Sequence, residues 1–441
     1  MSIILLVPPN AEGFIRDTYY GCWHKKKFIN YSWPPLYLRQ LNTLISNSKI
    51  FDLSKRTSEK AINILIKEKP KIIIVNIGTY TFQEDHLFLK KLKQKISCKI
   101  IAFGQHSTIL PNDTLKSGVI DFAIKGEPEE IIQKVVKNIN EYDKLKKING
   151  VCLKNHISEE KAQIKNLDKV PIPKRNLEFD NKYFNPLARN LPYTSMTITR
   201  GCPYSCTFCT VPSLYGKTFR KRSINIVIKE IKQIKELGYK EIFFRDENLT
   251  LDKKYIKELC EKIIKEKIEI SWIGNSRVDT VDFELLKIMK KAGCHLLKFG
   301  VESSNQNMLN LLKKGTTIKQ VKQTVENCKK IGIDTLCHFM IGNPGETRKD
   351  ILKTINFAIE LDPRYASFDV LINYPKTNIL NEKQTKISKE ELNKLHNYAF
   401  RKFYLRLGYI FRHLLNTKSF TELILKIKST IQLWKGLLVN E

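Results

Sequence analysis

The sequence predicts an α/β protein with two parallel-sheet domains in series and a helical C-terminal extension. Apolar strand-like segments alternate with amphipathic helical segments through residues 1–140 and again through residues 191–377. A polar, Lys-rich connector covers residues 141–190, and a helical extension covers residues 378–441. With 441 residues and 42% hydrophobic content, the chain exceeds one ordinary domain and can bury sizeable cores.

The first domain is predicted to be Rossmann-like, with a flavodoxin-like parallel sheet and helices on both of its faces. Strands are expected at residues 3–7, 50–53, 72–77, 100–103 and 122–124, and helices at 36–46, 59–67, 86–96 and 129–139. Such sheets bind ligands beyond the carboxyl ends of their strands. The loops expected there are Pro8-Pro9-Asn10, Gly78-Thr79-Tyr80, Gly104-Gln105-His106 and Gly126-Glu127-Pro128. Three of these four loops contain a glycine, which lets the backbone approach a ligand closely.

The connector carries turn signals and no residues to which we assign chemistry. Asn149-Gly150 predicts a hairpin, and Pro171, Pro173 and Pro186 indicate an extended end.

The second domain is predicted to be an open, partial (β/α)6 barrel of the TIM type. Its strands are expected at residues 193–199, 241–245, 269–274, 295–301, 335–341 and 367–373. Its helices are expected at residues 225–237, 253–264, 283–291, 318–331 and 348–361. In βα-barrels, the reacting groups gather at the C-terminal ends of the strands.

Polar side chains follow the last five of these six strands. They are Asp246-Glu247-Asn248, Asn275-Ser276-Arg277-Val278-Asp279, Glu302-Ser303, Gly342-Asn343-Pro344-Gly345-Glu346-Thr347 and Tyr374-Pro375-Lys376-Thr377. Together they suit a charged ligand that is rich in hydroxyl groups. Taken singly, Glu302 also fits a helix cap and Gly345 a simple turn.

Three cysteines follow the first barrel strand on one short loop, Cys202-Pro-Tyr-Ser-Cys206-Thr-Phe-Cys209. Close spacing lets several sulfurs converge on one metal centre. A structural zinc site closes with four ligands, and the chain has no second Cys-x-x-Cys pair. A four-iron cluster held by three cysteines leaves one iron open for a small molecule. A zinc knuckle or a group of buried cysteines is the alternative.

The spacing of this loop resembles the signature of the radical SAM superfamily. The resemblance implies that Cys202, Cys206 and Cys209 hold a catalytic [4Fe-4S] cluster, which cleaves S-adenosylmethionine (SAM) to the 5'-deoxyadenosyl radical. It further implies SAM contacts from the strand-end loops. These are Asp246, Glu247 and Asn248 at the amino group, Glu302 and Ser303 at the ribose or amino acid, Arg277 in an Arg-x-Asp element, and Gly342 and Gly345 beside the adenine.

Residues 1–140 resemble the cobalamin-binding domain that precedes many radical SAM domains. The likeness rests on Val7-Pro8-Pro9, Pro34-Pro35-Leu36, Gly104-Gln105-His106-Ser107 and Lys125-Gly126-Glu127-Pro128-Glu129. It implies cobalamin contacts from Gly78, Thr79, Gly104, His106, Gly126 and Glu127. Asp-x-His-x-x-Gly is absent, as it commonly is in these relatives, and Phe103-Gly104-Gln105-His106 replaces their frequent Gly-Gly-Pro-His. A domain that has lost its ligand is the alternative.

The expected function is cobalamin-dependent C-methylation, or a related radical modification, of a small-molecule or lipid substrate. The resemblance also implies an external electron donor such as flavodoxin or ferredoxin. One alternative is a methylthiotransferase that acts on RNA or protein, although Cys22, Cys98 and Cys152 do not form the second cluster motif of that class. The other is a non-catalytic iron-sulfur or zinc protein that binds RNA through its basic surface.

Composition limits the partners and the compartment. The net charge of +31 favours anionic partners, but the lysines are spread over many helix surfaces, so nucleic acid ranks second. Ten cysteines, of which the seven outside the cysteine loop lack pairing spacings, and an N-terminus without leader features predict a cytoplasmic protein. The basic, amphipathic tail, including residues 400–409 and 420–438, is expected to pack on the barrel as a helical cap, with peripheral membrane contact as the alternative.

Overall fold

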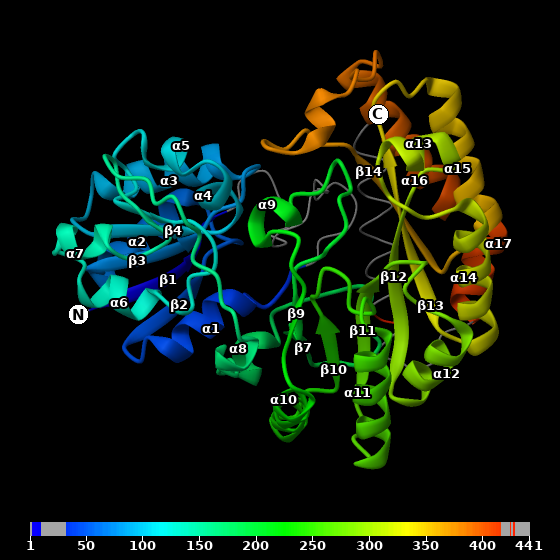
Figure 1. The fold of residues 1–441 in the computed structure, drawn as a ribbon, viewed down its shortest axis with the longest axis horizontal. Coiled ribbons are helices and arrows are strands. Elements are labelled where there is room, and N and C mark those ends of the chain that lie inside the picture. Colours follow the sequence, from blue (N-terminus) through cyan, green and yellow to red (C-terminus); the bar gives the residue numbers. More distant parts are fainter. Residues whose placement is uncertain (1, 10–31, 416–423, 425–426, 428–441) are drawn as a thin grey trace. The chain divides into compact units, whose positions relative to one another are not determined.

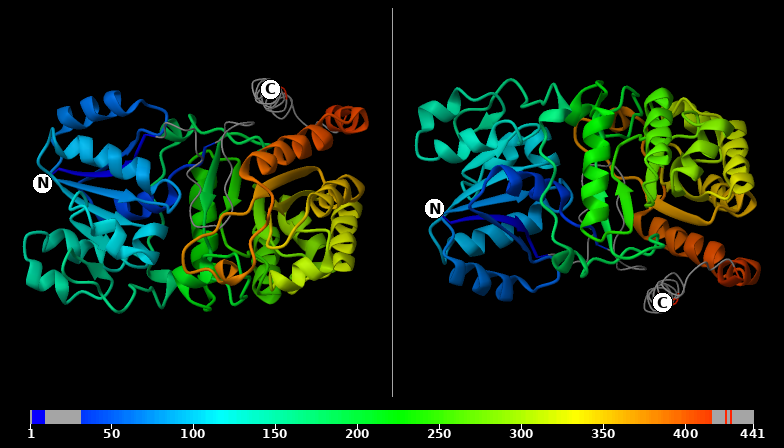
Figure 2. Two further views of the ribbon diagram at one scale, coloured as in Figure 1. Left: turned by 90° about the horizontal axis from the view of Figure 1, so that it is seen from above. Right: turned by 90° about the horizontal axis from the view of Figure 1, so that it is seen from below.

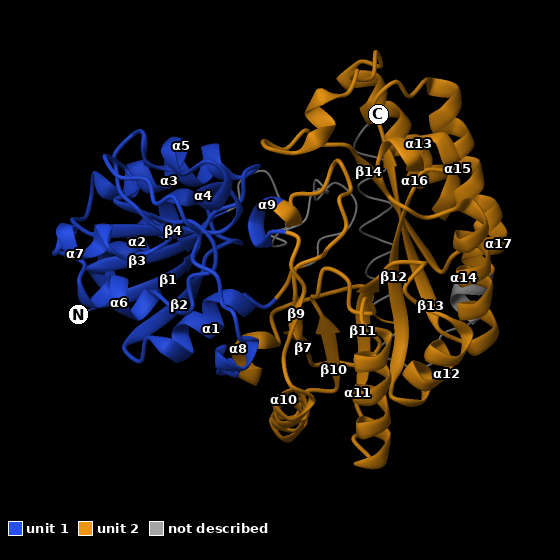
Figure 3. Cartoon of the chain, in the orientation of Figure 1, with its two compact units in different colours: residues 1–19, 34–175, 213–216 blue, residues 20–33, 176–212, 217–441 orange. Residues whose placement is uncertain are grey.

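The computed structural model describes residues 2–9, 32–415, 424 and 427 (Figure 1). Cys22, Asn10 of the first predicted loop and most of the helix expected at 420–438 lie outside the described residues. Two compact units make up the fold (Figure 3). Of the described residues, unit 1 contains 2–9, 34–175 and 213–216, and unit 2 contains the remainder.

Unit 1 is built on a six-stranded sheet with the order β2-β1-β3-β4-β5-β6. All its strand pairs are parallel except β5 with β6. The strands are β1 (Ile3–Val7), β2 (Ser48–Asp52), β3 (Ile72–Asn76), β4 (Lys99–Phe103), β5 (Phe122–Ile124) and β6 (Val151–Cys152). The order of β1 to β5 is the one found in flavodoxin-like sheets, which confirms the predicted fold class.

Helices cover both faces of this sheet (Figure 2). They are α1 (Leu36–Leu44), α2 (Ser58–Glu68), α3 (Phe82–Lys93), α4 (Gln105–Ile109), α5 (Pro111–Leu115), α6 (Ile132–Lys137) and α7 (Tyr142–Lys146). Because side chains alternate along a strand, Ile73 and Val75 face one side and pack with Leu65 of α2 and Leu89 of α3. This burial of apolar side chains holds the loops at the carboxyl ends of the strands on a rigid support.

The connector folds mostly with unit 1, and one local prediction there was wrong. No hairpin forms at Asn149-Gly150; the chain instead turns between Leu153 and His156, whose backbone groups exchange two hydrogen bonds of 2.7 and 3.0 Å. Gly150 takes φ +88°, and a Cβ added there would lie 2.6 Å from the backbone of Ala162. The glycine therefore serves a close tertiary approach that a local turn rule does not anticipate.

Unit 2 contains a second six-stranded sheet, all parallel, with the order β14-β13-β12-β11-β10-β7. Its strands are β7 (Tyr193–Met196), β10 (Glu241–Phe244), β11 (Ser271–Ser276), β12 (Cys294–Glu302), β13 (Asp334–Ile341) and β14 (Tyr365–Val370). A two-stranded ribbon, β8 (Thr199–Arg200) with β9 (Arg220–Lys221), stands beside it. The six strands form the open, partial barrel that the sequence predicts.

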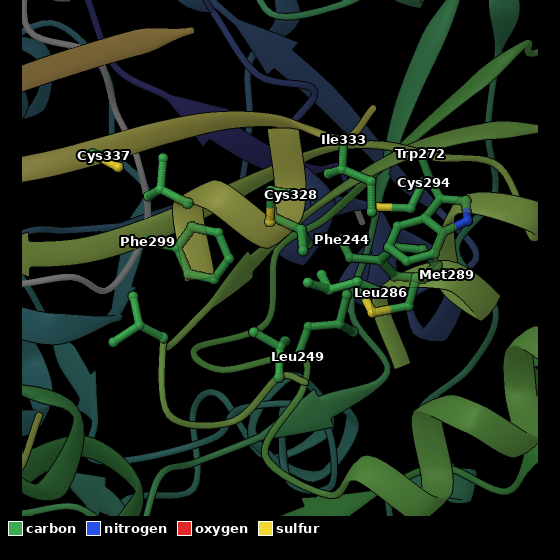
Figure 4. Packing of buried hydrophobic residues seen from close by; sticks show 14 of the residues in the cluster. Phe244, Leu249, Trp272, Leu286, Met289, Cys294, Phe299, Cys328, Ile333 and Cys337 are labelled. Carbon is green, nitrogen blue, oxygen red and sulfur yellow. The ribbon is translucent and has the colours of Figure 1, made fainter. Parts of the chain in front are cut away.

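The barrel helices cover the outer face of these strands (Figure 1). The helices of unit 2 are α8 (Leu177–Asp180), α10 (Ile224–Glu236), α11 (Lys253–Lys265), α12 (Phe283–Lys291), α13 (Gln306–Leu311), α14 (Ile318–Ile331), α15 (Arg348–Leu361), α16 (Lys389–Tyr404) and α17 (Leu407–Leu415). Phe244, Trp272 and Phe299 point outward into the core that they share with Leu286 and Met289 of α12 (Figure 4). Helix α16 joins the same core, as expected of a helical cap.

Side-chain caps determine where four of these helices begin. Asp252, Asp282, Thr317 and Thr347 each accept a hydrogen bond from a backbone N–H in the first turn of the helix that follows. The last two form reciprocal capping boxes. These caps limit the loops at the C-terminal ends of the strands to defined lengths, and those loops carry the candidate site.

Helix α9 (Val211–Tyr215) begins directly after the cysteine loop, and its residues 213–215 belong to unit 1. The Lys161 ammonium donates to the Ser213 carbonyl, and Gln163 Nε2 donates to the Tyr215 carbonyl at 3.0 Å. Unit 1 is therefore completed by a piece of chain that follows the cysteines.

Candidate active site

The cysteine loop leaves the end of β7 and is fixed by backbone hydrogen bonds on both sides. The predicted strand over 193–199 ends early, at Met196, because Thr199 pairs with β9 instead. Thr207 N donates to the Leu312 carbonyl at 3.0 Å, and Ile379 N donates to the Thr207 carbonyl at 2.9 Å. Cys209 N donates to the Cys206 carbonyl at 3.1 Å, which turns the loop tightly between the last two thiols.

All three thiols of the loop are partly exposed. Cys206 and Cys209 pack against an apolar group that includes Phe208, Leu312 and Met340. Burial raises the pKa of Cys209 to about 12, and the nearby sulfurs of Cys206 and Cys202 add to this rise. Thiolates placed this close need a bound cation to offset their repulsion. Among the described residues, no three His, Cys, Asp or Glu side chains converge as ligands of a single metal ion.

The other cysteines in the described part of the chain are committed to packing. Cys260, Cys294, Cys328 and Cys337 are buried in the core of unit 2, and Cys98 and Cys152 are buried in that of unit 1. Burial raises the pKa of each of these thiols. The cysteine loop therefore offers three sulfur ligands, and none of these six provides a fourth.

Arg277 lies beside the cysteine loop and is held in place on several sides. Its Nε and Nη2 each donate to Asp279 at 2.9 Å, and Nη2 also donates to the Lys314 carbonyl at 2.6 Å. The guanidinium stacks 3.6 Å from the centre of the Tyr204 ring, and Nη1 lies 3.8 Å from Cys206 Sγ. Burial disfavours its charge, but Asp279 outweighs this effect and raises the pKa of Arg277. A fixed positive charge therefore faces the thiols.

A second cation, Lys314, was not predicted. Its Nζ lies 2.6 Å from Glu302 Oε1, and it stands 5.9 Å from the centre of the Phe208 ring in the cysteine loop. Burial lowers the pKa of Lys314, but Glu302 and other neighbours together raise it above its ordinary value. Lys314 follows α13, twelve residues after Glu302, so only the folded chain brings the two together.

Glu302 takes a conformation that is rare for a residue with a side chain. Its φ is +67°, and the register between β12 and β13 shifts between Gly300 and Glu302. Left-handed backbone at the end of a strand carries strain of about 1 kcal/mol or more. The Glu302 carboxylate is bonded to Lys314, and its contact with SAM stays a prediction.

Glu247 and Asp246, which follow β10, have different surroundings. Asp246 Oδ1 accepts from Ile198 N at 3.0 Å and from Thr199 N and Oγ1 at 2.5 and 2.7 Å, so this oxygen closes the end of β7. Burial raises the pKa of Asp246 to about 6. Glu247 is partly exposed and accepts from Gly201 N at 3.0 Å, directly before Cys202. Burial and the charge of Asp246 raise the pKa of Glu247 to about 7.

Asn248 and Ser303 support their own loops. Asn248 Oδ1 accepts from the hydroxyls of Thr250 and Thr280 at 3.4 and 3.3 Å. Ser303 Oγ accepts from Asn305 N at 3.2 Å, in the turn that precedes α13. A direct contact of either side chain with SAM stays a prediction.

Gly342 and Gly345 both adopt positive φ, +78° and +70°. A Cβ added at Gly342 would lie 3.1 Å from Leu392, whereas space is open at Gly345. Glu346 closes the loop by accepting from Asn343 N at 2.9 Å, and burial raises the pKa of Glu346 to about 7. The contact of Gly342 and Gly345 with the adenine of SAM stays a prediction.

In unit 1, hydrogen bonds join the loops at the carboxyl ends of β3, β4 and β5. Thr79 N donates to Gln105 Oε1 at 3.4 Å, and Gly126 N donates to Thr108 Oγ1 at 3.0 Å. The hydroxyls of Thr79 and Ser107 are buried, and neither has a hydrogen-bond partner among the described residues. A polar ligand at this edge would supply the missing partners.

Other residues predicted to contact cobalamin interact with neighbouring protein groups. The His106 ring stacks on Phe82 at 3.8 Å between ring centres, and its Nε2 lies 3.2 Å from Asp113 Oδ2. Glu127 Oε2 accepts from Ile164 N at 2.9 Å. A Cβ added at Gly126 would lie 2.2 Å from the Ala162 carbonyl oxygen, and one at Gly104, with φ +108°, would lie 2.2 Å from Asn76 Oδ1. These residues give the loops their shape, and their contact with a ligand stays a prediction.

Comparison with known proteins identifies the family. A family model described as the radical SAM superfamily matches residues 196–358, which include the cysteine loop. An uncharacterized methyltransferase of Pyrococcus horikoshii is 32% identical over 391 residues, which are 86% of this chain and 82% of that protein. The chain belongs to the radical SAM superfamily.

Two further relatives match most of this radical SAM protein. The anaerobic magnesium-protoporphyrin IX monomethyl ester cyclase of Rubrivivax gelatinosus is 24% identical over 382 residues, which are 81% of this chain and 67% of that one. The structure of the radical SAM methyltransferase TsrM of Kitasatospora setae, with cobalamin and a [4Fe-4S] cluster bound, matches with a TM-score of 0.68 and 16% identity. The match covers 86% of this chain and 73% of TsrM and shows a shared fold.

Membership of the radical SAM superfamily makes the chain an enzyme that uses a [4Fe-4S] cluster, SAM and an electron donor. The donor set fits the cluster, since three thiols share one loop and two cations, Arg277 and Lys314, stand beside it. Among the described residues, no helix combines the length and apolarity needed to cross a membrane.

Proposed function

We propose that the protein is a cobalamin-dependent radical SAM methyltransferase that modifies carbon in a small-molecule or lipid substrate. The observation that carries this proposal is the pairing of two sites in one chain. Unit 2 offers a three-thiol loop flanked by Arg277 and Lys314, and unit 1 offers a flavodoxin-like sheet edge with the buried hydroxyls of Thr79 and Ser107. The relatives named as methyltransferases support the choice of reaction.

The protein groups around the cysteine loop have definable tasks. We assign Cys202, Cys206 and Cys209 as ligands of the cluster, with Arg277 and Lys314 offsetting its negative charge. Bound there, the cluster supplies the electron that cleaves SAM to methionine and the 5'-deoxyadenosyl radical. We assign Glu247 and Glu302 as acceptors of hydrogen bonds from the amino or ribose groups of SAM. The apolar side chains of Phe208, Leu312 and Met340, which pack against Cys206 and Cys209, would limit the access of water to the cluster.

We assign cobalamin to the carboxyl edge of the unit 1 sheet, at the loops of Gly78, Thr79, Gly104 and Gly126. When bound, it carries the methyl group that is transferred. Backbone groups of the glycine loops and the Thr79 and Ser107 hydroxyls would hold its polar side chains. The electron donor of the enzyme would be a small redox protein such as flavodoxin or ferredoxin. If the substrate is a lipid, we expect the basic C-terminal tail to make a peripheral contact with the membrane.

The methylthiotransferase alternative requires a second cluster in the N-terminal part of the chain. Cys98 and Cys152 are the described candidates, and both are buried among apolar side chains. They stand more than 50 residues apart in the sequence and do not form the short-spaced cysteine motif of a cluster loop. These two cysteines are therefore better explained as core residues.

The test is anaerobic reconstitution with iron, sulfide and cobalamin, followed by addition of SAM and a reductant. We expect 5'-deoxyadenosine, and S-adenosylhomocysteine that forms only when cobalamin is present. Cys206→Ala should abolish 5'-deoxyadenosine, whereas Cys260→Ala, which removes a thiol from α11, should not. If the cluster-loaded protein forms no 5'-deoxyadenosine, the radical assignment is wrong and a basic RNA-binding protein becomes the better hypothesis. Formation of 5'-deoxyadenosine without cobalamin binding would remove only the methylation proposal.

A further inference from the structure

The concave face of the unit 2 barrel has three levels of side chains. Its floor is apolar and consists of Tyr193, Phe243, Ile273, Leu296 and Leu336, with Trp33 packed against them. Its upper level is the apolar group around the cysteine loop, which includes Phe208, Leu312 and Met340. Strand alternation places a polar tier between these two levels, because every second residue of a strand faces the same side. The tier consists of Ser195, Arg245, Asn275, Lys298, His338, Ser367 and Asp369.

The polar tier carries more positive than negative charge. Its single carboxylate, Asp369, accepts from Ser367 Oγ at 2.8 Å and lies 3.6 Å from His338 Nδ1. Lys298 has no hydrogen-bond acceptor within 3.5 Å and no carboxylate within 4.0 Å among the described residues. Desolvation and the charge of Arg245 lower the pKa of Lys298 to about 7, and Asp369 partly opposes them. Lys298 therefore has a cation as a neighbour and no anion bonded to it among the described residues, and an anion bound beside it would favour its charged form.

Arg245 is buried beside these groups, where burial lowers its pKa to about 9 and the charge of Glu247 partly opposes this effect. Its guanidinium stacks 4.1 Å from the centre of the Trp33 ring, and only 7% of the residue is exposed. Trp33 is itself fixed by edge contacts with Phe243 and Tyr193, at 4.9 and 6.3 Å between ring centres. A guanidinium keeps its charge even when buried, and a stacked one loses little freedom when it binds a carboxylate or phosphate.

We propose that Arg245 and Lys298 bind an anionic group of the substrate, a carboxylate or a phosphate, on the concave face of the barrel. This inference rests on the proposed function and narrows its substrate class. An anion held in the polar tier would fix one end of the substrate, and the rest would extend along the concave face toward the cysteine loop. Arg245 and Lys298 would then select acidic substrates over neutral ones of similar shape.

The test measures whether small anions protect Lys298 from an amine-reactive reagent. The cluster-loaded protein is treated at pH 7 with formaldehyde and dimethylamine–borane, which methylate amines and release no carboxylate, and labelling at each lysine is followed by peptide mass spectrometry. Inorganic phosphate and acetate are added in separate arms at constant ionic strength. At ten times its dissociation constant, the bound anion should slow labelling of Lys298 about tenfold. Exposed Lys235 of α10 should be labelled at the same rate throughout.

Two variants make the assignment specific. Arg245→Gln should remove most of the protection of Lys298, and Lys235→Gln should leave it unchanged. If Arg245→Gln fails to fold, Arg245→Lys is the second variant. It keeps the charge but removes the planar guanidinium that stacks on Trp33, so it should weaken the protection of Lys298 severalfold. Protection by phosphate alone, or by acetate alone, supports the site and identifies the anion.

Three results would overturn the proposal: no protection by either anion, full protection in Arg245→Gln, or a Lys298 that no reagent reaches. Formation of 5'-deoxyadenosine is measured in the same preparation. If neither anion protects Lys298 but 5'-deoxyadenosine forms, the anion site is rejected and the radical chemistry stands. Clear protection without 5'-deoxyadenosine would leave the anion site in place and reject the radical chemistry.

Discussion

Lys314 Nζ and Glu302 Oε1 are 2.6 Å apart, and both side chains are less than a tenth exposed. A buried ion pair of this kind depends on both partners, because removing one leaves a charge in a poorly polar place. Glu302 is also the residue whose backbone is left-handed. The pair thus couples the strained end of β12 to a residue beside the cysteine loop.

Lys314→Met should lower the free energy of unfolding by about 3 kcal/mol, since the Glu302 carboxylate loses its cation. The double variant Lys314→Met/Glu302→Gln should recover most of this loss. Urea unfolding of the two variants and the parent measures both effects. Lys322→Met is the matched control, because the Lys322–Glu360 pair is of similar length, 2.7 Å, but lies at the surface, and its loss should cost less than about 1 kcal/mol. A double variant no more stable than Lys314→Met would contradict the coupling.

Arg277→Gln should lower the reduction potential of the reconstituted cluster, because the reduced cluster carries more negative charge and loses a nearby cation. A charge at this distance corresponds to a change on the order of 100 mV. Arg277→Lys, which keeps the charge, should change the potential much less. Redox titration followed by electron paramagnetic resonance gives the values, and Arg348→Gln, an exposed arginine, serves as control. Equal potentials for the Gln and Lys variants would show that the charge of Arg277 does not act on the cluster.

Gly104→Ala should destabilise the protein by more than about 2 kcal/mol. Part of the cost is the left-handed backbone, at about 1 kcal/mol, and the rest is the clash with Asn76 Oδ1. Gly118→Ala is the matched control, because Gly118 has φ +72° with nothing within 4 Å of an added Cβ. Gly118→Ala should lose only the stability that corresponds to the left-handed backbone. Thermal unfolding measures both, and equal losses would mean that Asn76 moves aside freely.

Glu346 should make stability depend on pH. Its folded-state pKa of about 7 exceeds the ordinary value of 4.5, so the folded chain holds this proton more tightly than the unfolded chain. The stabilisation from Glu346 is therefore full below about pH 4.5 and is lost as pH rises to about 7. Glu346→Gln, which cannot ionise, should gain up to roughly 3 kcal/mol relative to the parent between these limits. Unfolding at pH 5 and pH 8 tests this, and a pH-independent difference between parent and variant would contradict it.

Much of the fold and part of the site could be predicted from the sequence because their signals are local. Alternating apolar segments located the strands, and the cysteine spacing located the loop and the family. Arg277, after its strand, proved to lie beside the thiols. Local signals of this kind survive folding because they reflect periodicity and chain direction, which tertiary contacts rarely change.

The remaining features depend on residues that are distant in the chain. Lys314 has no motif, and only the packing of α13 brings it to Glu302. Asp246 looked like a ligand contact, yet one of its oxygens closes the end of β7. The loop position of His106 did not reveal its neighbours, Phe82 and Asp113, which come from two other helices. Lys298 did carry a signal, since it is a cation between Leu297 and Phe299 in the middle of a strand.

Helix α9 has a consequence for how the protein is made. Lys161 and Gln163 find their acceptors at Ser213 and Tyr215, which are synthesised about 50 residues later. On the ribosome, unit 1 cannot finish folding until the cysteine loop has already emerged. An expression fragment that stops at residue 175 would likewise lack these acceptors, so a shortened gene meant to produce unit 1 alone should also encode residues 213–216, for example through a short fused linker.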